Sequence, residues 1–323
     1  MTTNRTQRSR KQKGMLLNIL LTATLLLAAC EKVIIDEEKG NTSPDNKTIT
    51  IRVTGTEPYY AHEGSTRAPV EVTRVCTRLC FAIYQDGKRV KSINQKQGDT
   101  DFGTAKITLE TGNYQLLILG HSSNGNPSTT NPQKIQFTNA TASGGTGFSD
   151  TFYHYGDLTL DNNGPQTYDY QLTRATGMFR LVVNDPKPQN VRKFLFYYVG
   201  GSGTLDATTG YGCVNSKQNV VVETDASMDN KPTMFEIYTF PHEEYKELTI
   251  TVKALDGNDE IVHQREFSGV WVQRNAISQY SGNFFSDTPY TPDTPTPITP
   301  EPTTPSWNIL VDTIWAATNI FTY

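Results

Sequence analysis

Hydrophobic and polar residues alternate along most of this chain with the period of an extended strand. In the run 48–54, isoleucine and valine alternate with threonine and arginine, so one face of the predicted strand is apolar. Residues 114–119 are apolar on both faces, a pattern typical of a strand inside a sheet. The Asp-Gly steps at 86–87 and 256–257 are hairpin turn signals. We predict strands at 48–54, 72–84, 88–93, 105–109, 114–119, 134–137, 152–160, 166–172, 177–183, 194–199, 220–223, 233–240, 248–255 and 260–267.

Short strands separated by polar turns, about 8–12 residues apart, predict an all-β fold built of β-sandwiches. No stretch longer than a turn or two has the helical period. About 290 residues follow the N-terminal segment, a length that suggests two domains. The predicted parts are a lipoprotein signal 1–29, an acidic linker 30–47, β-sandwiches at 48–172 and 173–287, a Thr/Pro spacer 288–305 and a C-terminal strand segment 306–323.

The C-terminal end has a different pattern. Residues 288–305 hold seven Pro and seven Thr, which favours a stiff spacer about 56 Å long at 3.1 Å per residue. Every second residue after it is mostly apolar or aromatic, and its length predicts two strands with a break near 316–317. An exposed strand of this kind needs a partner. It either joins its own second sandwich as an edge strand or inserts into another subunit by β-augmentation. For insertion, the donor residues are Trp307, Ile309, Val311, Thr313 and Trp315.

The N-terminal end predicts export and lipid attachment. Five basic residues precede the apolar run 15–29, the order of a secretory signal. As a helix this run spans about 22 Å, short of a ~30 Å hydrocarbon core. Leu27-Ala28-Ala29-Cys30 closes the run and resembles a bacterial lipobox, in which signal peptidase II cuts before the cysteine. Cys30 would then carry a diacylglycerol and an N-acyl chain, enough for stable anchoring. An ordinary signal peptide followed by a chance cysteine is the alternative.

Charge limits the partners of the mature chain. Removal of the signal lowers Lys plus Arg from 29 to 24 against 33 acidic residues, a net charge of about −9. An acidic chain with scattered lysines is a poor nucleic-acid binder. The acidic cluster 36–38 behind Cys30 resembles the surface-export signal of Bacteroidales lipoproteins, although a solvated linker is an equally good interpretation.

The remaining cysteines, Cys76, Cys80 and Cys213, are too few for a disulfide scaffold. Cys76 and Cys80 would lie about 13 Å apart along one strand, too far to pair. We expect Cys76 and Cys80 to be buried free thiols. A single disulfide bond from one of them to Cys213 is the alternative.

Patterns that carry catalytic chemistry are missing from the sequence. The five histidines are dispersed without metal-ligand spacing, and neither a Gly-x-Ser-x-Gly nor a phosphate-binding glycine motif is present. The glycine-rich run 200–203 is predicted to be a loop. Oxygen ligands at 256–260 could bind calcium, but a plain hairpin is the simpler interpretation. We expect no enzyme activity, catalytic residue, metal, cofactor or small-molecule substrate.

Together these features resemble the FimB-type and Mfa-type anchor lipoproteins of Bacteroidales (type V) fimbriae, most closely the minor-fimbrium anchor subunit. The resemblance covers roughly residues 30–286 and rests on the lipobox, the strand 114–119, Leu172-Thr173-Arg174 and the run Glu-Ile-Tyr-Thr-Phe-Pro at 236–241. It implies two transthyretin-like (Greek-key) β-sandwich domains in tandem. It also implies a non-catalytic role on the outer membrane, where the protein holds the shaft at the cell surface and limits its length. The implied partner is a fimbrial shaft subunit.

In related shaft subunits, an arginine-specific protease removes the first strand and opens an acceptor groove. The bonds that correspond here are Arg67-Ala68 and Arg52-Val53. An anchor is expected to keep its first strand, and an uncut anchor has to donate a strand rather than accept one.

Two other functions compete with the anchor. A fimbrial tip adhesin would lack a donor tail and have its first strand removed. A surface glycan-binding lipoprotein would need exposed coplanar aromatic side chains, for which the candidates are Tyr59, Tyr60, Tyr197 and Tyr198.

Overall fold

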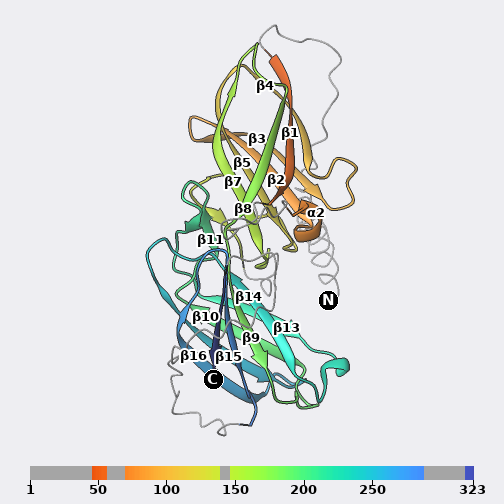
Figure 1. Ribbon diagram of the computed structural model, residues 1–323, viewed down its shortest axis with the longest axis vertical. Helices are drawn as coiled ribbons and strands as arrows, with labels where there is room; N and C mark the ends of the chain where they lie inside the picture. The colour runs from red at the N-terminus through yellow and green to blue at the C-terminus, as the bar shows by residue number, and fades with distance from the viewer. Residues whose placement is uncertain (1–45, 57–69, 139–145, 287–316) are drawn as a thin grey trace, which may run out of the picture. The chain divides into compact units, whose positions relative to one another are not determined.

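The structure is a computed structural model that describes residues 46–56, 70–138, 146–286 and 317–323 (Figure 1). Their regular secondary structure is almost entirely strand, which confirms the predicted all-β fold. The helical segments among them are the short helix α2 (Val72–Val75) and the 3-10 turn η1 (Ala226–Met228). Across these ranges, no apolar helix reaches the length that crossing a membrane requires.

The first sandwich is a seven-stranded sheet of β1 (Asn46–Thr56), β2 (Arg78–Gln85), β3 (Lys88–Lys96), β4 (Thr104–Glu110), β5 (Gly112–His121), β7 (Thr151–Leu160) and β8 (Thr167–Arg174). Its strand order is β3-β2-β5-β7-β8-β1-β4. Ile49 and Ile107, from β1 and β4, lie in one buried cluster with Phe81 and Ile118, from β2 and β5. The sheet therefore folds across its own core as a β-sandwich.

The second sandwich follows in the sequence. Its strands are β9 (Gly177–Val183), β10 (Lys193–Val199), β13 (Gln218–Glu223), β14 (Thr233–Thr239), β15 (Glu247–Leu255), β16 (Ile261–Trp271), β17 (Ala276–Gly282) and β18 (Ala317–Thr322). They form two four-stranded sheets, β13-β10-β15-β16 and β14-β9-β17-β18. Aromatic side chains dominate the core between them, including Phe179, Phe194, Phe267 and Tyr280.

A smaller sheet brings together residues from both halves of the sequence. Strands β6 (Ile135–Gln136), β11 (Thr204–Asp206) and β12 (Tyr211–Gly212) pair in the order β12-β11-β6. Under them, Leu117 and Phe137 pack in one cluster with Leu205 and Phe240. This third cluster explains why Tyr84 and Leu117, on the outer face of β2 and β5, are fully buried.

The prediction of one strand over 72–84 is wrong at its start. Val72–Val75 is a helical turn in which the Cys76 N–H donates to the Val72 carbonyl, N···O 2.9 Å. The turn shifts the strand alternation, so Cys76 joins the first core beside Leu79, whereas Cys80 lies in the third cluster. Both thiols are buried and free, as expected, and Cys213 is a free, exposed thiol.

Turn chemistry was predicted well. Asp86 and Gly87 both have positive φ, 51° and 74°, as the tight hairpin between β2 and β3 requires. Asp256 Oδ1 accepts hydrogen bonds from the backbone N–H groups of Asn258 and Glu260, so this carboxylate caps the turn between β15 and β16. The prediction omitted β11, β12 and β17. The first two are very short, and β17 pairs in parallel with strands distant in sequence.

Candidate functional site

Most residues predicted for function lie outside the described residues. They are Leu27, Ala28, Ala29 and Cys30 of the lipobox, the Arg67-Ala68 bond, and the donor residues Trp307, Ile309, Val311, Thr313 and Trp315. These assignments stay predictions. The described part of the tail is its last strand, β18, and the functional site is built around it.

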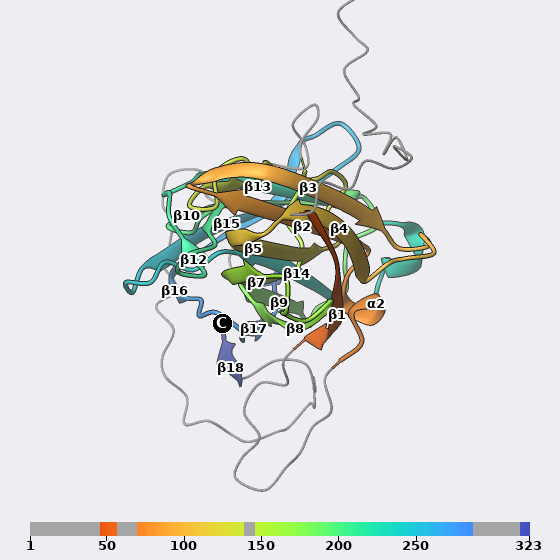
Figure 2. The same ribbon diagram turned by 90° about the horizontal axis from the view of Figure 1, so that it is seen from above.

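Strand β18 completes the sheet β14-β9-β17-β18 at its edge (Figure 2). It runs parallel to β17, with Ala317 opposite Ala276 and Thr322 opposite Ser281. The Tyr323 N–H donates to the Ser281 carbonyl, N···O 3.2 Å. The end of the tail therefore pairs with its own second sandwich, the first of the two alternatives predicted for it. The predicted break near 316–317 adjoins residues outside the described ranges and stays a prediction.

Two aromatic side chains bring β18 into the core. The Phe321 ring stacks on Tyr280 at a centroid distance of 4.8 Å. The Tyr323 ring meets Phe267 edge-on at 5.0 Å, and the Arg265 guanidinium lies 5.5 Å from its centroid. Aromatic pairs in these geometries add roughly 0.5–1.5 kcal/mol beyond area burial. The strand is thus held by side chains as well as by backbone pairing.

The last residue is closely fitted against β17. A Cβ atom on Gly282 would lie 2.2 Å from the Tyr323 carbonyl oxygen, so only glycine fits there. Tyr323 Oη donates to the Val182 carbonyl at 3.3 Å. Burial raises the pKa of this phenol well above its usual range. Tyr323 is therefore held in a defined position against β17 and β9.

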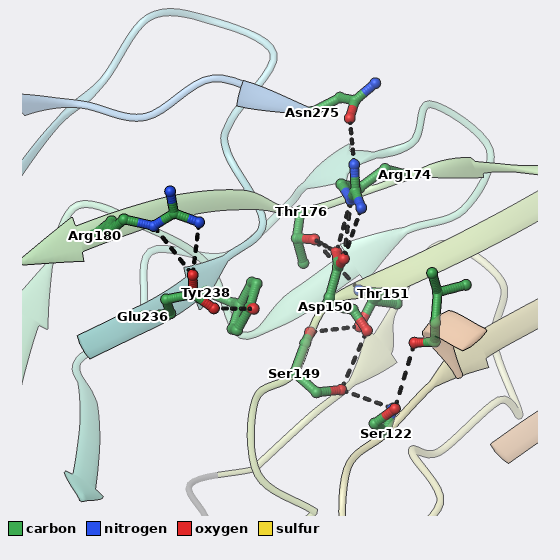
Figure 3. A network of polar contacts seen from close by, with 11 residues as sticks. Ser122, Ser149, Asp150, Thr151, Arg174, Thr176, Arg180, Glu236, Tyr238 and Asn275 are labelled. Atoms are coloured by element: carbon green, nitrogen blue, oxygen red, sulfur yellow. Dashed lines mark hydrogen bonds and ion pairs between the residues drawn. The ribbon is translucent and has the colours of Figure 1, made fainter. Parts of the chain in front are cut away.

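A polar network surrounds Arg174, the last residue of β8 (Figure 3). Its Nε and Nη2 donate to the two Asp150 carboxylate oxygens, each at 2.9 Å, and Nη1 donates to Asn275 Oδ1 at 2.7 Å. Thr176 Oγ1 donates to Asp150 Oδ1 at 2.7 Å. The guanidinium carbon lies 4.7 Å from the Phe152 ring centroid. Because the Arg174 side chain is 3% exposed, this charge depends on its partners.

Two of the motifs behind the fimbrial resemblance, 172–174 and 236–241, have structural roles in the fold. Leu172 is buried in the first core and Arg174 is the centre of the polar network. Glu236 of β14 accepts a hydrogen bond from Arg180 Nη2 at 2.7 Å (Figure 3), and Phe240, which follows β14, is buried in the third cluster. Sequence reasoning named Arg174 but missed Asp150, because no spacing rule links the end of β8 to the residue before β7, 24 positions away.

The tyrosines proposed for glycan binding do not form a platform where they are described. Tyr198 is 1% exposed in the second core, and its Oη donates to the Tyr238 carbonyl at 2.8 Å. Tyr197 is half-buried. Tyr59 and Tyr60 lie outside the described residues. Within the described ranges, no group of three or more His, Cys, Asp or Glu side chains is placed to hold a metal ion.

The described ranges define an all-β protein with two sandwich cores and a self-paired C-terminal strand. Its sequence matches the model of a family of unknown function, DUF6562, over residues 40–304, and the chain belongs to that family. No curated protein matches the sequence.

Several solved structures are similar to this chain at low sequence identity. A "putative adhesin" of Bacteroides ovatus has 12% identity and a TM-score of 0.45, over 80% of this chain and 94% of its own. The fimbrial anchor protein Mfa2 of Porphyromonas gingivalis has 14% identity and a TM-score of 0.38, over 68% and 81%. One of the "putative polysaccharide binding proteins" of Bacteroides thetaiotaomicron has 8% identity and a TM-score of 0.39, over 71% and 98%. At these values the likeness identifies no functional residue of this chain.

Proposed function

We propose that this chain is the non-catalytic anchor of a fimbrium. Lipid on Cys30 holds it in the outer membrane, and the sandwiches stand at the cell surface. The C-terminal tail binds the first shaft subunit by strand complementation and so limits shaft length. The sequence support is the lipobox together with the anchor-like motifs at 172–174 and 236–241.

The structural observation that the proposal uses is the seating of β18, which restricts the donor segment to the part of the tail before residue 317. Thirty residues, 287–316, separate it from the fold, yet it returns to the edge of its own sheet with aromatic side chains in the core. The far end of the tail is thereby attached to the second sandwich. Trp307 to Trp315 directly precede this attachment and keep the apolar alternation of a strand. A partner with an open groove would bind them through backbone hydrogen bonds and alternate side-chain pockets.

The pairing of the first strand supports a role in which this chain donates a strand to its partner rather than accepting one. Strand β1 is paired on both edges, with β4 and with β8, so its place in the sandwich is filled. The Arg52-Val53 bond lies within this strand, and Arg52 forms a bidentate ion pair with Asp169. A protease needs an accessible, extended segment, which a doubly paired strand does not offer.

Removal of the tail tests the proposal. A chain ending at Asp287 lacks the spacer, the donor residues and β18, but keeps Cys30. We expect it to stay in the outer membrane and to be lost from purified fimbriae. Unchanged co-purification with the shaft would overturn the donor role and move the contact to the sandwich surface.

A second set of variants separates the donor residues from the fold. Trp307→Ala combined with Trp315→Ala, in the full chain, removes two proposed anchors of the donor strand and leaves β18 intact. Ile320→Ala is the matched control, because Ile320 is 37% exposed on β18 itself. We expect the double variant to lose shaft association and the control to keep it. Equal behaviour of the two would contradict the assignment of 307–315.

The N-terminus of the fimbria-associated protein distinguishes the anchor from a tip adhesin. An anchor should begin at a lipid-modified Cys30. A protein that begins at Ala68 would have lost its whole first strand, and one that begins at Val53 most of it; either start would overturn the anchor assignment.

A further inference from the structure

One outer surface of the second sandwich exposes two aromatic side chains in contact. Within the described ranges, Tyr245 and Trp271 are the exposed aromatic residues, at 61% and 39%. Their ring centroids are 5.8 Å apart and their planes are inclined by 62°, so the rings meet edge to face and each offers its own face rather than one flat surface. Grouped exposed apolar surface marks interaction sites more often than scattered residues do. The proposed anchor role uses neither side chain.

Strand pairing places a carboxylate beside the two rings. Trp271, the last residue of β16, lies opposite Glu247, the first residue of β15. Their neighbours Leu248 and Val270 are buried in the second core, so Glu247 and Trp271 point to the outer face. Tyr245 Oη donates to Glu247 Oε1 at 2.8 Å. The rings and the carboxylate therefore share one surface, defined here as the Tyr245–Trp271 platform.

An open groove adjoins the platform. Glu247 and Lys246 line a hollow of about 450 Å³ together with Asn215, Ser216 and Lys217. Lys246 Nζ donates to Asn215 Oδ1 at 3.3 Å. The groove thus presents an amide, a hydroxyl, two ammonium groups and a carboxylate next to the aromatic platform.

The glycine run at 200–203 shapes the wall of this groove. Gly200 has φ +96°, and a Cβ there would lie 2.3 Å from the Glu247 carbonyl oxygen. No side chain can therefore fill the hollow from this position. The Gly203 N–H donates to Ser216 Oγ at 3.1 Å and the Ser202 N–H to the Phe240 carbonyl at 3.2 Å. These two N–H groups are therefore engaged within the protein and do not point to a bound phosphate.

We propose that the Tyr245–Trp271 platform and its groove bind a pyranose unit of a saccharide. A pyranose has a face of C–H groups, which packs on the electron-rich face of an aromatic ring, and a rim of hydroxyls. The hydroxyls can donate to Glu247 and Asn215 and accept from Lys217 and Lys246. Aromatic walls with a few convergent polar groups are the usual composition of small-molecule sites.

The test measures saccharide binding by the full chain. The protein is kept in a detergent without a sugar headgroup and applied to an array of neutral hexose oligosaccharides and of oligosaccharides containing uronic acid. We expect the protein to bind saccharides from at least one of these two groups. Titration with a bound saccharide should change the tryptophan fluorescence of the protein. Trp271→Ala and Tyr245→Ala should each weaken binding at least tenfold, whereas Trp271→Phe should keep most of it.

Ile261→Ala is the matched control, since Ile261 lies on the same strand, β16, and is also 39% exposed. Its affinity should equal that of the unsubstituted chain. Failure of the unsubstituted chain to bind any saccharide of the array would overturn the proposal. So would equal losses in Trp271→Ala and Ile261→Ala. Loss of shaft association in Trp271→Ala, without saccharide binding, would assign the platform to a protein partner instead.

Discussion

At the scale of single residues, two basic side chains that would ordinarily lie on the surface, those of Lys187 and Arg174, are buried. The Lys187 side chain is fully buried, where its Nζ contacts Asp229 and donates to the Val191 carbonyl at 2.8 Å. Arg174 is similarly enclosed by Asp150 and Asn275. Removing a charge from water is costly unless partners replace the water, so each of these residues depends on its neighbours.

Asp150 is the sharpest test of this dependence. Asp150→Ala leaves the Arg174 charge buried without its carboxylate and should lower the free energy of unfolding by about 3–5 kcal/mol. Urea denaturation followed by circular dichroism measures the change. The control is Asp169→Ala, which breaks the half-exposed pair with Arg52. Exposed pairs contribute little, so this variant should stay close to the unsubstituted chain. Equal losses in the two variants would contradict the buried role.

His121 should make stability depend on pH. It is fully buried, its Nδ1 accepts from the Ser123 N–H, and burial lowers its pKa from 6.5 to about 4, with a further contribution from Arg78. The unfolded chain therefore takes up a proton below pH 6.5 that the folded chain refuses until pH 4. Stability is full above pH 6.5 and falls by up to about 3 kcal/mol between pH 6.5 and 4.

The measurement is the free energy of unfolding across that pH window. His121→Gln removes the titrating group and should show a shallower decline than the unsubstituted chain. His154→Gln serves as control, because its ring is half-exposed and most of the decline should remain. An unchanged slope in His121→Gln would show that other groups cause the pH dependence.

At the scale of elements, β18 is distant in sequence from the second sandwich but packs as part of it. It shares no short connection with the second sandwich, but Phe321 and Tyr323 complete a core that would otherwise be open beside Tyr280 and Phe267. An uncovered sheet edge with aromatic side chains would be an aggregation site. Pairing in parallel with β17 covers it.

Substitutions within β18 test this contribution. Phe321→Ala removes the ring stacked on Tyr280 and should destabilise the second sandwich by about 2 kcal/mol, because the Phe321 side chain is only partly buried. Ile320→Ala, on the exposed side of the same strand, should change the melting temperature little. Thermal unfolding compares the two variants. Similar melting temperatures would mean that β18 adds little to the core.

At the scale of the whole molecule, the proposed attachments lie at opposite ends of the chain. Cys30→Ala should therefore release the protein from the outer membrane without unfolding the sandwiches, and fimbriae should be shed or lengthened. Membrane fractionation and microscopy of the fimbriae measure both effects. Cys213→Ala is the control, since this exposed thiol has no lipobox before it. A Cys30→Ala protein that stays in the membrane would defeat the lipoprotein assignment.

The local signals in the sequence predicted much of the fold. An apolar run that stops at Asn-Asp-Pro located β9 at Gly177–Val183, period-two alternation located β1, and the Asp-Gly steps located the turns after β2 and β15. These features depend on neighbours in the chain, so a linear pattern contains them. The helical turn Val72–Val75 was missed because β-branched residues favour strands, and the burial of Val72 against the first core outweighs that preference.

The sequence by itself determined the all-β class, the strands and turns, and the strand-like alternation of the tail, because side-chain alternation and turn chemistry are local. Only the tertiary structure decided that β18 lies parallel to β17 and that Asp150 meets Arg174. It also decided that Tyr198 is buried while Tyr245 and Trp271 are exposed together. Such contacts join residues far apart in the chain, and the free energy of burying or pairing them exists only when the sheets have packed.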